Sequence, residues 1–243
     1  MKLAVTFDFW DTLYPSVGRE GGPGIPERRA AVIRDFLAER GREVTIEQAR
    51  RAYDEADAAH ARHWLGDELR QPTVGEALDC IALVLGTKLR TRERTELGRR
   101  LQLRDELGRL EPFDGVAELI RDLGRDRRLG IISDTWLTPG ELARDMLRRH
   151  DLLDAFSATL FSDETGFLKP HSRPFQLACS ALSTAPGETI HVGDSERRDV
   201  AGARRAGMKA VFLAWDRPHG DSAADRVVNT PAELLPAIRG LAS

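Results

Sequence analysis

The sequence predicts an α/β protein, with a Rossmann-like parallel sheet core that carries helices on both faces and an inserted all-helical domain. Two observations predict this fold class. From about residue 112 to the end, short continuous apolar segments alternate with helical patterns, as buried parallel strands alternate with crossover helices. From about residue 26 to 110, helical periodicity continues without a convincing strand.

Five apolar segments are predicted strands because their apolar residues are continuous rather than alternating, which is typical of strands buried on both faces. They are residues 3–7, 129–132, 158–161, 189–192 and 210–213, of which 158–161 shows the weakest pattern. Amphipathic periodicity predicts helices between and after them. These are residues 116–123, 141–149, 174–182, 197–206 and a last helix near 231–238.

The inserted segment carries four more predicted helices, at residues 30–40, 46–65, 74–85 and 92–107. A glycine-rich segment, 17–24, leads into it, and a segment with proline and glycine, 108–115, leads out. We therefore predict a core made of residues 1–16 and 111–243 and a helical cap made of residues 17–110. The chain passes between core and cap twice at the same place, which predicts a hinge about which the cap opens and closes.

The composition describes an ordinary globular protein. The chain has 243 residues, 41% of them hydrophobic and 31% charged, and a net charge of -3 that favours neither nucleic acid nor an anionic membrane as partner. Cys80 and Cys179 are far apart and match no metal-binding spacing, so a reducing compartment is expected. With no leader pattern and no long apolar run, we expect a cytoplasmic protein. The sequence does not indicate an oligomeric state.

Polar residues follow three of the predicted strands. Asp8 follows the first strand, Ser133 and Asp134 follow the strand at 129–132, and Asp194 follows the strand at 189–192. Ligands of open parallel sheets bind beyond the carboxyl ends of the strands, so these side chains are expected to converge. Lys169 lies between the last two groups, and it is notable because only four of the 36 basic residues are lysine.

This set of side chains suits phosphoryl transfer. Two carboxylates from different strands can hold Mg²⁺, which prefers oxygen ligands and retains several waters. A carboxylate can also attack phosphorus and form an aspartyl-phosphate. A hydroxyl and a lysine can bind and neutralise the oxygens of the transferring group.

The same residues resemble the four motifs of the haloacid dehalogenase-like superfamily, in the right order and across the whole core. Asp8, Thr12 and Leu13 match the first motif, DxDxT[LV], while Ser133 matches the second and Lys169 the third. The helical insert resembles the C1-type cap of this family. The fourth motif is matched at Gly193, Asp194, Ser195, Asp199, Gly202, Ala203, Ala206 and Gly207.

The resemblance implies a nucleophile and a metal site. Asp8 would be both the nucleophile and a ligand of Mg²⁺. The backbone carbonyl of Trp10 and the carboxylate of Asp194 would be the other protein ligands of the metal.

The resemblance also implies roles for the residues around the nucleophile. Ser133 and Lys169 would bind the transferring group, and Lys169 would also orient Asp8. Thr12 and Asp134 would line the substrate site, with Thr12 positioning its loop. Asp199 would lie behind the direct ligands, near Lys169 or the metal-bound waters.

One position departs from the pattern. Phosphatases of this family usually carry a second aspartate two residues after the nucleophile, as general acid and base, and here that residue is Trp10. Loss of such a group costs roughly 10²- to 10⁴-fold in rate. Asp11, Asp134 or a cap residue could replace it, or the substrate's leaving group could need no proton.

Three hypotheses follow. The first is a Mg²⁺-dependent phosphatase that acts on a small soluble phosphate through an aspartyl-phosphate at Asp8. The second is a 2-haloacid dehalogenase, because those relatives also carry an aromatic residue at the position of Trp10. The third is a catalytically weak member of the fold that binds a ligand. Dehalogenases typically have Ser-Asn in the fourth motif, whereas Gly193-Asp194 resembles the metal-binding form, so the first is favoured.

Three further residues lie together near the end of one insert helix. His60, His63 and Trp64 are interpreted as part of a solvated or inter-helix face rather than as substrate ligands. His191, inside the predicted strand at 189–192, is interpreted as a core residue with satisfied hydrogen bonds.

Overall fold

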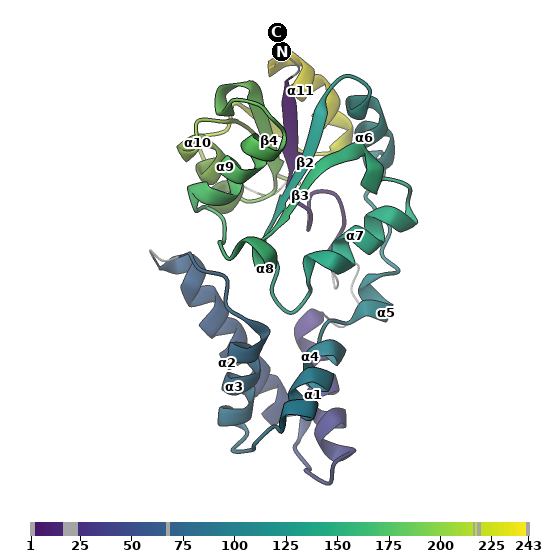
Figure 1. Ribbon diagram of the computed structural model, residues 1–243, viewed down its shortest axis with the longest axis vertical. Helices are drawn as coiled ribbons and strands as arrows, with labels where there is room; N and C mark the ends of the chain where they lie inside the picture. The colour runs from purple at the N-terminus through teal and green to yellow at the C-terminus, as the bar shows by residue number, and fades with distance from the viewer. Residues whose placement is uncertain (1–2, 17–23, 67–68, 216, 218–219, 242–243) are drawn as a thin grey trace.

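The computed structural model describes residues 3–16, 24–66, 69–215, 217 and 220–241. Most of the predicted first linker, residues 17–23, therefore lies outside the described residues. Figure 1 shows two parts: a sheet flanked by helices, and a group of helices that faces one end of the sheet.

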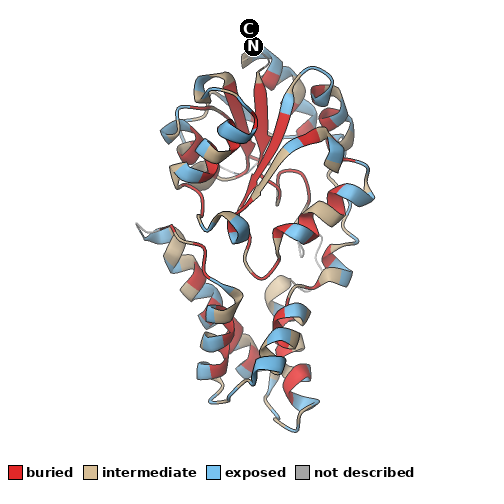
Figure 2. Cartoon of the chain, in the orientation of Figure 1, coloured by how far each residue is buried: buried red, intermediate tan, exposed pale blue. Residues whose placement is uncertain are grey.

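Within the described residues, six parallel strands form one sheet in the order β3-β2-β1-β4-β5-β6, which confirms the predicted fold class. β1 lies between β2 and β4, and every residue of β1 and β4 is buried (Figure 2). The strands are β1 (Ala4–Phe7), β2 (Arg128–Ser133), β3 (Phe156–Phe161), β4 (Thr189–Gly193), β5 (Lys209–Leu213) and β6 (Arg226–Val228).

Helices cover both faces of the sheet. The first face packs in one hydrophobic cluster with α6 (Val116–Gly124), α7 (Gly140–Arg149) and α11 (Leu234–Leu241). The second face packs in another cluster with α9 (Ser172–Ala181) and α10 (Ala201–Arg205). Short turns complete the core: η1 (Leu153–Ala155), α8 (Ser162–Thr165), η2 (Pro186–Glu188), η3 (Glu196–Val200) and η4 (Pro231–Glu233).

The helices of the insert have a hydrophobic core of their own. They are α1 (Ile25–Ala38), α2 (Ile46–Leu65), α3 (Val74–Val84) and α4 (Thr91–Arg100). Capping boxes fix two of the starts: Thr45 and Gln48 bond each other's backbone N–H at α2, and Thr73 and Glu76 do so at α3. The starts of α2 and α3 are therefore set by local sequence, at the residues where the amphipathic pattern begins.

The prediction of one helix over residues 92–107 was wrong. The chain leaves the helix after α4 and starts again as α5 (Arg104–Leu107), because Leu103 has a left-handed φ of 55°. Leu97 and Leu101 pack in the cluster of the insert, whereas Leu103 and Leu107 pack in the core cluster with α6. The break redirects the apolar face from one hydrophobic cluster to the other.

Two other elements of the structure differ from the prediction. The helix expected at 197–206 is a π-helical turn, η3, followed by the short α10. β6 was not predicted because it has only three residues, of which Arg226 and Val227 are exposed. Among the described residues, no helix combines the length and apolar character that crossing a membrane requires.

Among the described residues, the insert contacts the core at the loop after β2, at the loop that leads from α8 to Lys169, and at η3. Arg29 of α1, only 4% exposed, donates hydrogen bonds to the Leu101 carbonyl (3.0 Å), the Tyr53 hydroxyl (3.2 Å) and the hydroxyl of Thr138 (2.8 Å), in the loop after β2. The Leu168 N–H donates to the Leu69 carbonyl at 2.7 Å, directly before Lys169. We propose that residues 17–110 act as a cap, whose contacts with the core fall on loops that carry predicted site residues.

Candidate active site

Asp8 lies at the end of the central strand, in a tightly hydrogen-bonded loop. Its N–H donates to the Val192 carbonyl at 2.8 Å, so the ends of β1 and β4 are tied together beside it. The N–H groups of Leu13 and Tyr14 both donate to the Phe9 carbonyl, at 2.9 and 3.1 Å. The Asp8 side chain is held at the carboxyl edge of the sheet and is only 5% exposed.

Two other residues of this loop were candidates from the sequence. Trp10 follows Asp8 by two residues, and its indole meets the Phe9 ring edge-on with centroids 4.9 Å apart. Asp11 has a left-handed φ of 56°, and its Oδ1 accepts hydrogen bonds from the N–H and the hydroxyl of Ser16, both at 3.1 Å. The Asp11 carboxylate therefore stabilises the loop.

Three carboxylates gather where β1 and β4 end. Asp8, Asp194 and Asp199 each offer an oxygen, and these oxygens lie within 4.8 Å of one another. One oxygen of Asp194, Oδ2, accepts a hydrogen bond from Arg217 at 3.1 Å, whereas Oδ1 is buried and has no hydrogen-bond partner in the described part of the chain. Burial, with the charges of Asp8 and Asp199, raises the pKa of Asp194 to about 7.

These observations fit a divalent metal ion. A buried carboxylate oxygen without a donor, next to a second carboxylate, is the donor set that Mg²⁺ takes in proteins. A cation between Asp8 and Asp194 would also relieve the repulsion that raises the pKa of Asp194. The residues present are therefore suited to hold the predicted metal.

Lys169 is buried in the middle of this group. Its Nζ lies 2.8 Å from Asp8 Oδ1 and 2.6 Å from Asp199 Oδ1, and it donates a third hydrogen bond to the Ile132 carbonyl at 3.0 Å. Burial alone would lower the pKa of Lys169, but the neighbouring carboxylates outweigh burial and raise it. The lysine is charged and holds Asp8 in one orientation.

Asp199 connects the lysine to the interior of the sheet. Besides Lys169 it binds the Ser195 N–H through Oδ2 (3.0 Å) and His191 Nε2 through Oδ1 (3.1 Å). His191 Nδ1 lies 2.9 Å from the hydroxyl of Thr6, so both ring nitrogens have partners. Gly193 makes room for this arrangement, since a Cβ there would lie 2.2 Å from the Asp199 Cγ.

The remaining predicted residues lie around this cluster. Ser133 ends β2 and is 2% exposed; in the described part of the chain its hydroxyl makes only a long contact of 3.5 Å to the Asp134 carbonyl. Asp134 Oδ1 accepts from the Lys169 N–H at 2.9 Å and Oδ2 is buried without a partner among the described residues; burial raises the pKa of Asp134 to about 6. The Thr12 hydroxyl is also buried, and no described residue bonds it.

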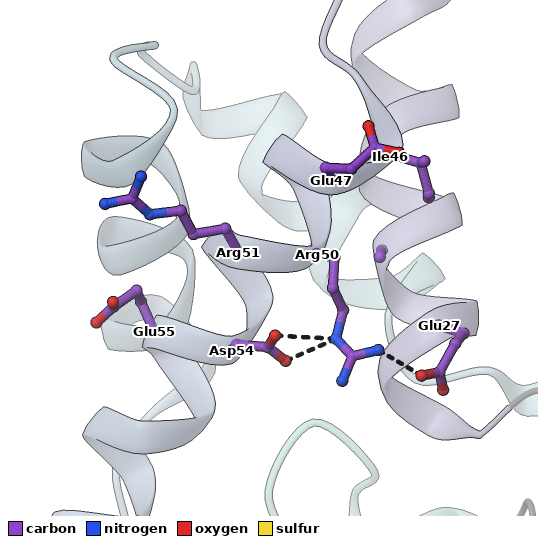
Figure 3. A pocket seen from close by; sticks show the side chains of 8 residues that line it. Glu27, Ile46, Glu47, Arg50, Arg51, Asp54 and Glu55 are labelled. Atoms are coloured by element: carbon purple, nitrogen blue, oxygen red, sulfur yellow. Dashed lines mark hydrogen bonds and ion pairs between the residues drawn. The ribbon is translucent and has the colours of Figure 1, made fainter.

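A hollow of about 460 Å³ lies elsewhere, between α1 and α2 of the insert (Figure 3). Arg50 spans it, with Nε donating to Asp54 Oδ1 at 2.8 Å and another nitrogen bonding Glu27. Four exposed carboxylates and two guanidiniums line the hollow, and none of these carboxylates is buried. The candidate active site is therefore the cluster at the sheet edge and not this hollow.

Comparisons with known proteins place the chain beside the following relatives. A family model described as haloacid dehalogenase-like hydrolase matches residues 3–207. The chain is 28% identical over 218 residues to a glyceraldehyde 3-phosphate phosphatase of Methanothermobacter thermautotrophicus, covering 88% of the chain and 86% of that protein. It is 41% identical over 93 residues to a phosphoserine phosphatase of Thermus thermophilus. This match spans only 37% of the chain and 37% of that protein.

A solved structure of similar fold is a phosphatase of Thermococcus onnurineus. It aligns with a TM-score of 0.67 at 24% identity and covers 99% of both chains. At this identity the likeness concerns the fold alone.

Proposed function

The chain belongs to the haloacid dehalogenase-like hydrolases, and from this premise we propose that it is a Mg²⁺-dependent phosphatase acting on a small soluble phosphate monoester. The observation that carries the proposal is the approach of Asp8 and Asp194, with one unpartnered carboxylate oxygen, beside a buried lysine. Relatives named as phosphatases of phosphoserine and glyceraldehyde 3-phosphate support the reaction class.

The proposed reaction has two displacements at phosphorus. A carboxylate oxygen of Asp8 forms a bond to phosphorus while the bond to the leaving oxygen breaks, which gives an aspartyl-phosphate and an oxyanion that takes a proton from solvent water. A water molecule then forms a bond to phosphorus and gives a proton to the solvent, the bond to Asp8 breaks, and phosphate leaves. When bound, Mg²⁺ would supply positive charge that offsets repulsion between the carboxylate and the phosphate.

The side chains around Asp8 have separate roles in this proposal. Lys169 keeps Asp8 oriented and supplies positive charge beside the transferring group, and the Ser133 hydroxyl binds an oxygen of that group. Asp199 keeps Lys169 in place. Asp8 and Asp194, with the Trp10 carbonyl, would hold the metal. Asp134 and Thr12 line the site with one unpartnered oxygen each.

A 2-haloacid dehalogenase is the second candidate, because Trp10 is aromatic where phosphatases of the family have an acid. Attack of Asp8 on carbon would expel halide, which needs neither a proton donor nor a metal. Asp194 argues against this function, because a third buried carboxylate next to Asp8 would repel a carboxylate substrate unless a cation were present.

Metal dependence separates the two functions. We expect phosphate release from p-nitrophenyl phosphate to fall at least about 10²-fold when EDTA removes the metal, since the metal supplies several kcal/mol of charge stabilisation. Asp194→Asn should show the same loss at low Mg²⁺. Asp154→Asn is the matched control, because Asp154 is exposed in η1, just before β3 begins.

The same preparations are given 2-chloropropionate, and chloride is measured. If chloride is released without metal and EDTA does not affect phosphate release, the proposed phosphatase function is wrong and the dehalogenase function takes its place.

Trp10 predicts a dependence on the leaving group. Without a general acid beside Asp8, aryl phosphates should turn over roughly 10²- to 10⁴-fold faster than alkyl phosphates, because an alkoxide needs a proton to leave and a phenolate does not. Trp10→Asp should raise the rate for alkyl phosphates and so reduce the ratio of aryl to alkyl turnover, whereas Trp10→Phe should leave that ratio unchanged. Equal wild-type rates for both classes would show that another residue already supplies the proton.

A further inference from the structure

Arg198 is a cation of the site to which the reaction above gives no task. It lies in η3, the π-helical turn that follows Asp194 and Ser195, and it is partly buried. Its backbone N–H donates to the Ser195 hydroxyl at 3.3 Å. Its guanidinium, however, has no hydrogen bond and no ion pair with any residue that the structure describes. A buried or half-buried guanidinium normally has an acceptor.

The cap holds this guanidinium in place. The Arg198 Cζ lies 5.1 Å from the ring centre of Trp64, near the end of α2, which is cation–π distance. The neighbouring Arg197 donates from Nη2 to the Trp64 carbonyl at 3.0 Å. Contact with a ring face leaves the planar edge of the guanidinium, with its paired N–H groups, available to another molecule.

Arg198 is electrostatically coupled to the site without being bound to any of its acids. Burial lowers the pKa of Arg198, but four carboxylates outweigh burial and raise it; they are those of Asp199, Asp8, Asp134 and Asp194. Lys169, by contrast, is already in contact with two of them. The charges that act on Arg198 are those of the candidate site, and Arg198 directly precedes Asp199 in the chain.

Two more polar atoms near Arg198 lack a hydrogen-bond partner among the described residues. Trp64 Nε1 and His60 Nε2 are buried, and neither has a hydrogen-bond partner among the described residues. The two rings lie 4.9 Å apart, and His60 also stacks on Trp136, three residues beyond Ser133, with 4.9 Å between centroids and planes 10° apart. Buried polar groups normally have hydrogen-bond partners, so a polar ligand at this seam between cap and core would supply the partners that these two atoms lack.

We propose that Arg198, stacked on Trp64, binds a carboxylate of the substrate, so that the preferred substrates are phosphorylated carboxylic acids. The inference rests on the proposed phosphatase function. A carboxylate fits because its two oxygens accept two parallel hydrogen bonds from one edge of a guanidinium and its single charge balances that of Arg198. The phosphate of the same molecule lies at Asp8 and Lys169, and the indole and imidazole of the cap close over the carboxylate end.

The test compares esters that differ only in the carboxylate. 2-Phosphoglycolate is paired with 2-hydroxyethyl phosphate, and 3-phosphoglycerate with glycerol 3-phosphate. We expect wild type to prefer the acid of at least one pair by roughly 10- to 100-fold in kcat/KM, the range of a charge-assisted hydrogen-bonded pair. Arg198→Gln should reduce that ratio at least tenfold, and Arg198→Lys should give an intermediate ratio. Arg205→Gln, at an exposed position of α10 away from Trp64, should keep it.

Binding is measured separately, by titration calorimetry of the same four esters into Asp8→Asn protein with and without Arg198→Gln. Tighter binding of the acid that Arg198→Gln abolishes supports the proposal even if no ester is hydrolysed, in which case only the phosphatase function fails. Equal affinity for acid and alcohol, or an equal loss for both on Arg198→Gln, overturns the proposal and leaves Arg198 as a general counter-charge. Circular dichroism at matched protein concentrations shows that each variant is folded.

Discussion

Asp8→Asn is expected to lower phosphate release from p-nitrophenyl phosphate by at least about 10³-fold, because an amide cannot form the covalent intermediate. The fold should survive, since the amide oxygen can still accept the hydrogen bond that Lys169 gives to Asp8 Oδ1 at 2.8 Å. Removing one of three carboxylates within 4.8 Å also removes repulsion. The Tm measured without metal should therefore not fall.

Two further measurements make this prediction specific. Mg²⁺ should raise the Tm of wild type, because a ligand that binds only the folded state stabilises it, and should raise that of Asp8→Asn much less. Rapidly quenched wild-type protein should carry one phosphoryl group on the peptide that contains Asp8. More than a tenth of wild-type activity in Asp8→Asn, or a phosphoryl group on another residue, would show that Asp8 is not the nucleophile. Asp154→Asn again serves as the unaffected control.

The fold was largely predictable because the pattern of apolar residues reflects both the burial and the periodicity of each element. A strand buried on both faces must be apolar throughout, and β1, β2 and β4 were found for that reason. β6 was missed because two of its three residues are exposed, so it has neither continuity nor length. The break at Leu103 was missed because periodicity does not reveal that successive leucines serve two different hydrophobic clusters.

The arrangement of the site was predictable to the extent that strand ends define it. Asp8 and Asp194 follow strands that are neighbours in the sheet, so the topology alone brings them together. Lys169 stood out as a lysine in a chain that is rich in arginine. Its bonds to Asp8 and Asp199 were expected only from the family resemblance.

The contacts across the seam were not predictable. The interpretation of His60 as part of a solvated or inter-helix face of the insert was wrong, because its ring is buried against Trp136 of the core loop. Arg198 gives no signal in a sequence where most cations are arginine, and its position depends on the π-helical turn. Both depend on how cap and core meet, which no local pattern encodes. The interpretation of His191 as a satisfied core residue is confirmed by its two partners.

Lys169→Met should destabilise the protein by about 3–5 kcal/mol, the cost of breaking a buried ion pair from one side. The substitution leaves Asp8 Oδ1 and Asp199 Oδ1 without their ammonium partner, and Asp199 is only 1% exposed to solvent. Methionine fills a similar volume, so the loss reflects charge rather than a cavity. The free energy of unfolding is measured by urea titration. Phosphatase activity should fall roughly 10²- to 10³-fold as well, as when one preorganised donor of a catalytic site is removed.

A second substitution separates charge from packing in this prediction. Lys169→Met with Asp199→Asn should recover part of the lost stability, because one of the two stranded carboxylates is then neutral. Lys209→Met is the matched control: Lys209 lies on β5 of the same sheet and donates to the neutral Leu241 carbonyl at 2.6 Å, so it should cost only about 1 kcal/mol. If Lys169→Met costs no more than Lys209→Met, or if the double variant is less stable than Lys169→Met alone, the lysine does not compensate the buried carboxylates, and the orientation of Asp8 must come from its own loop.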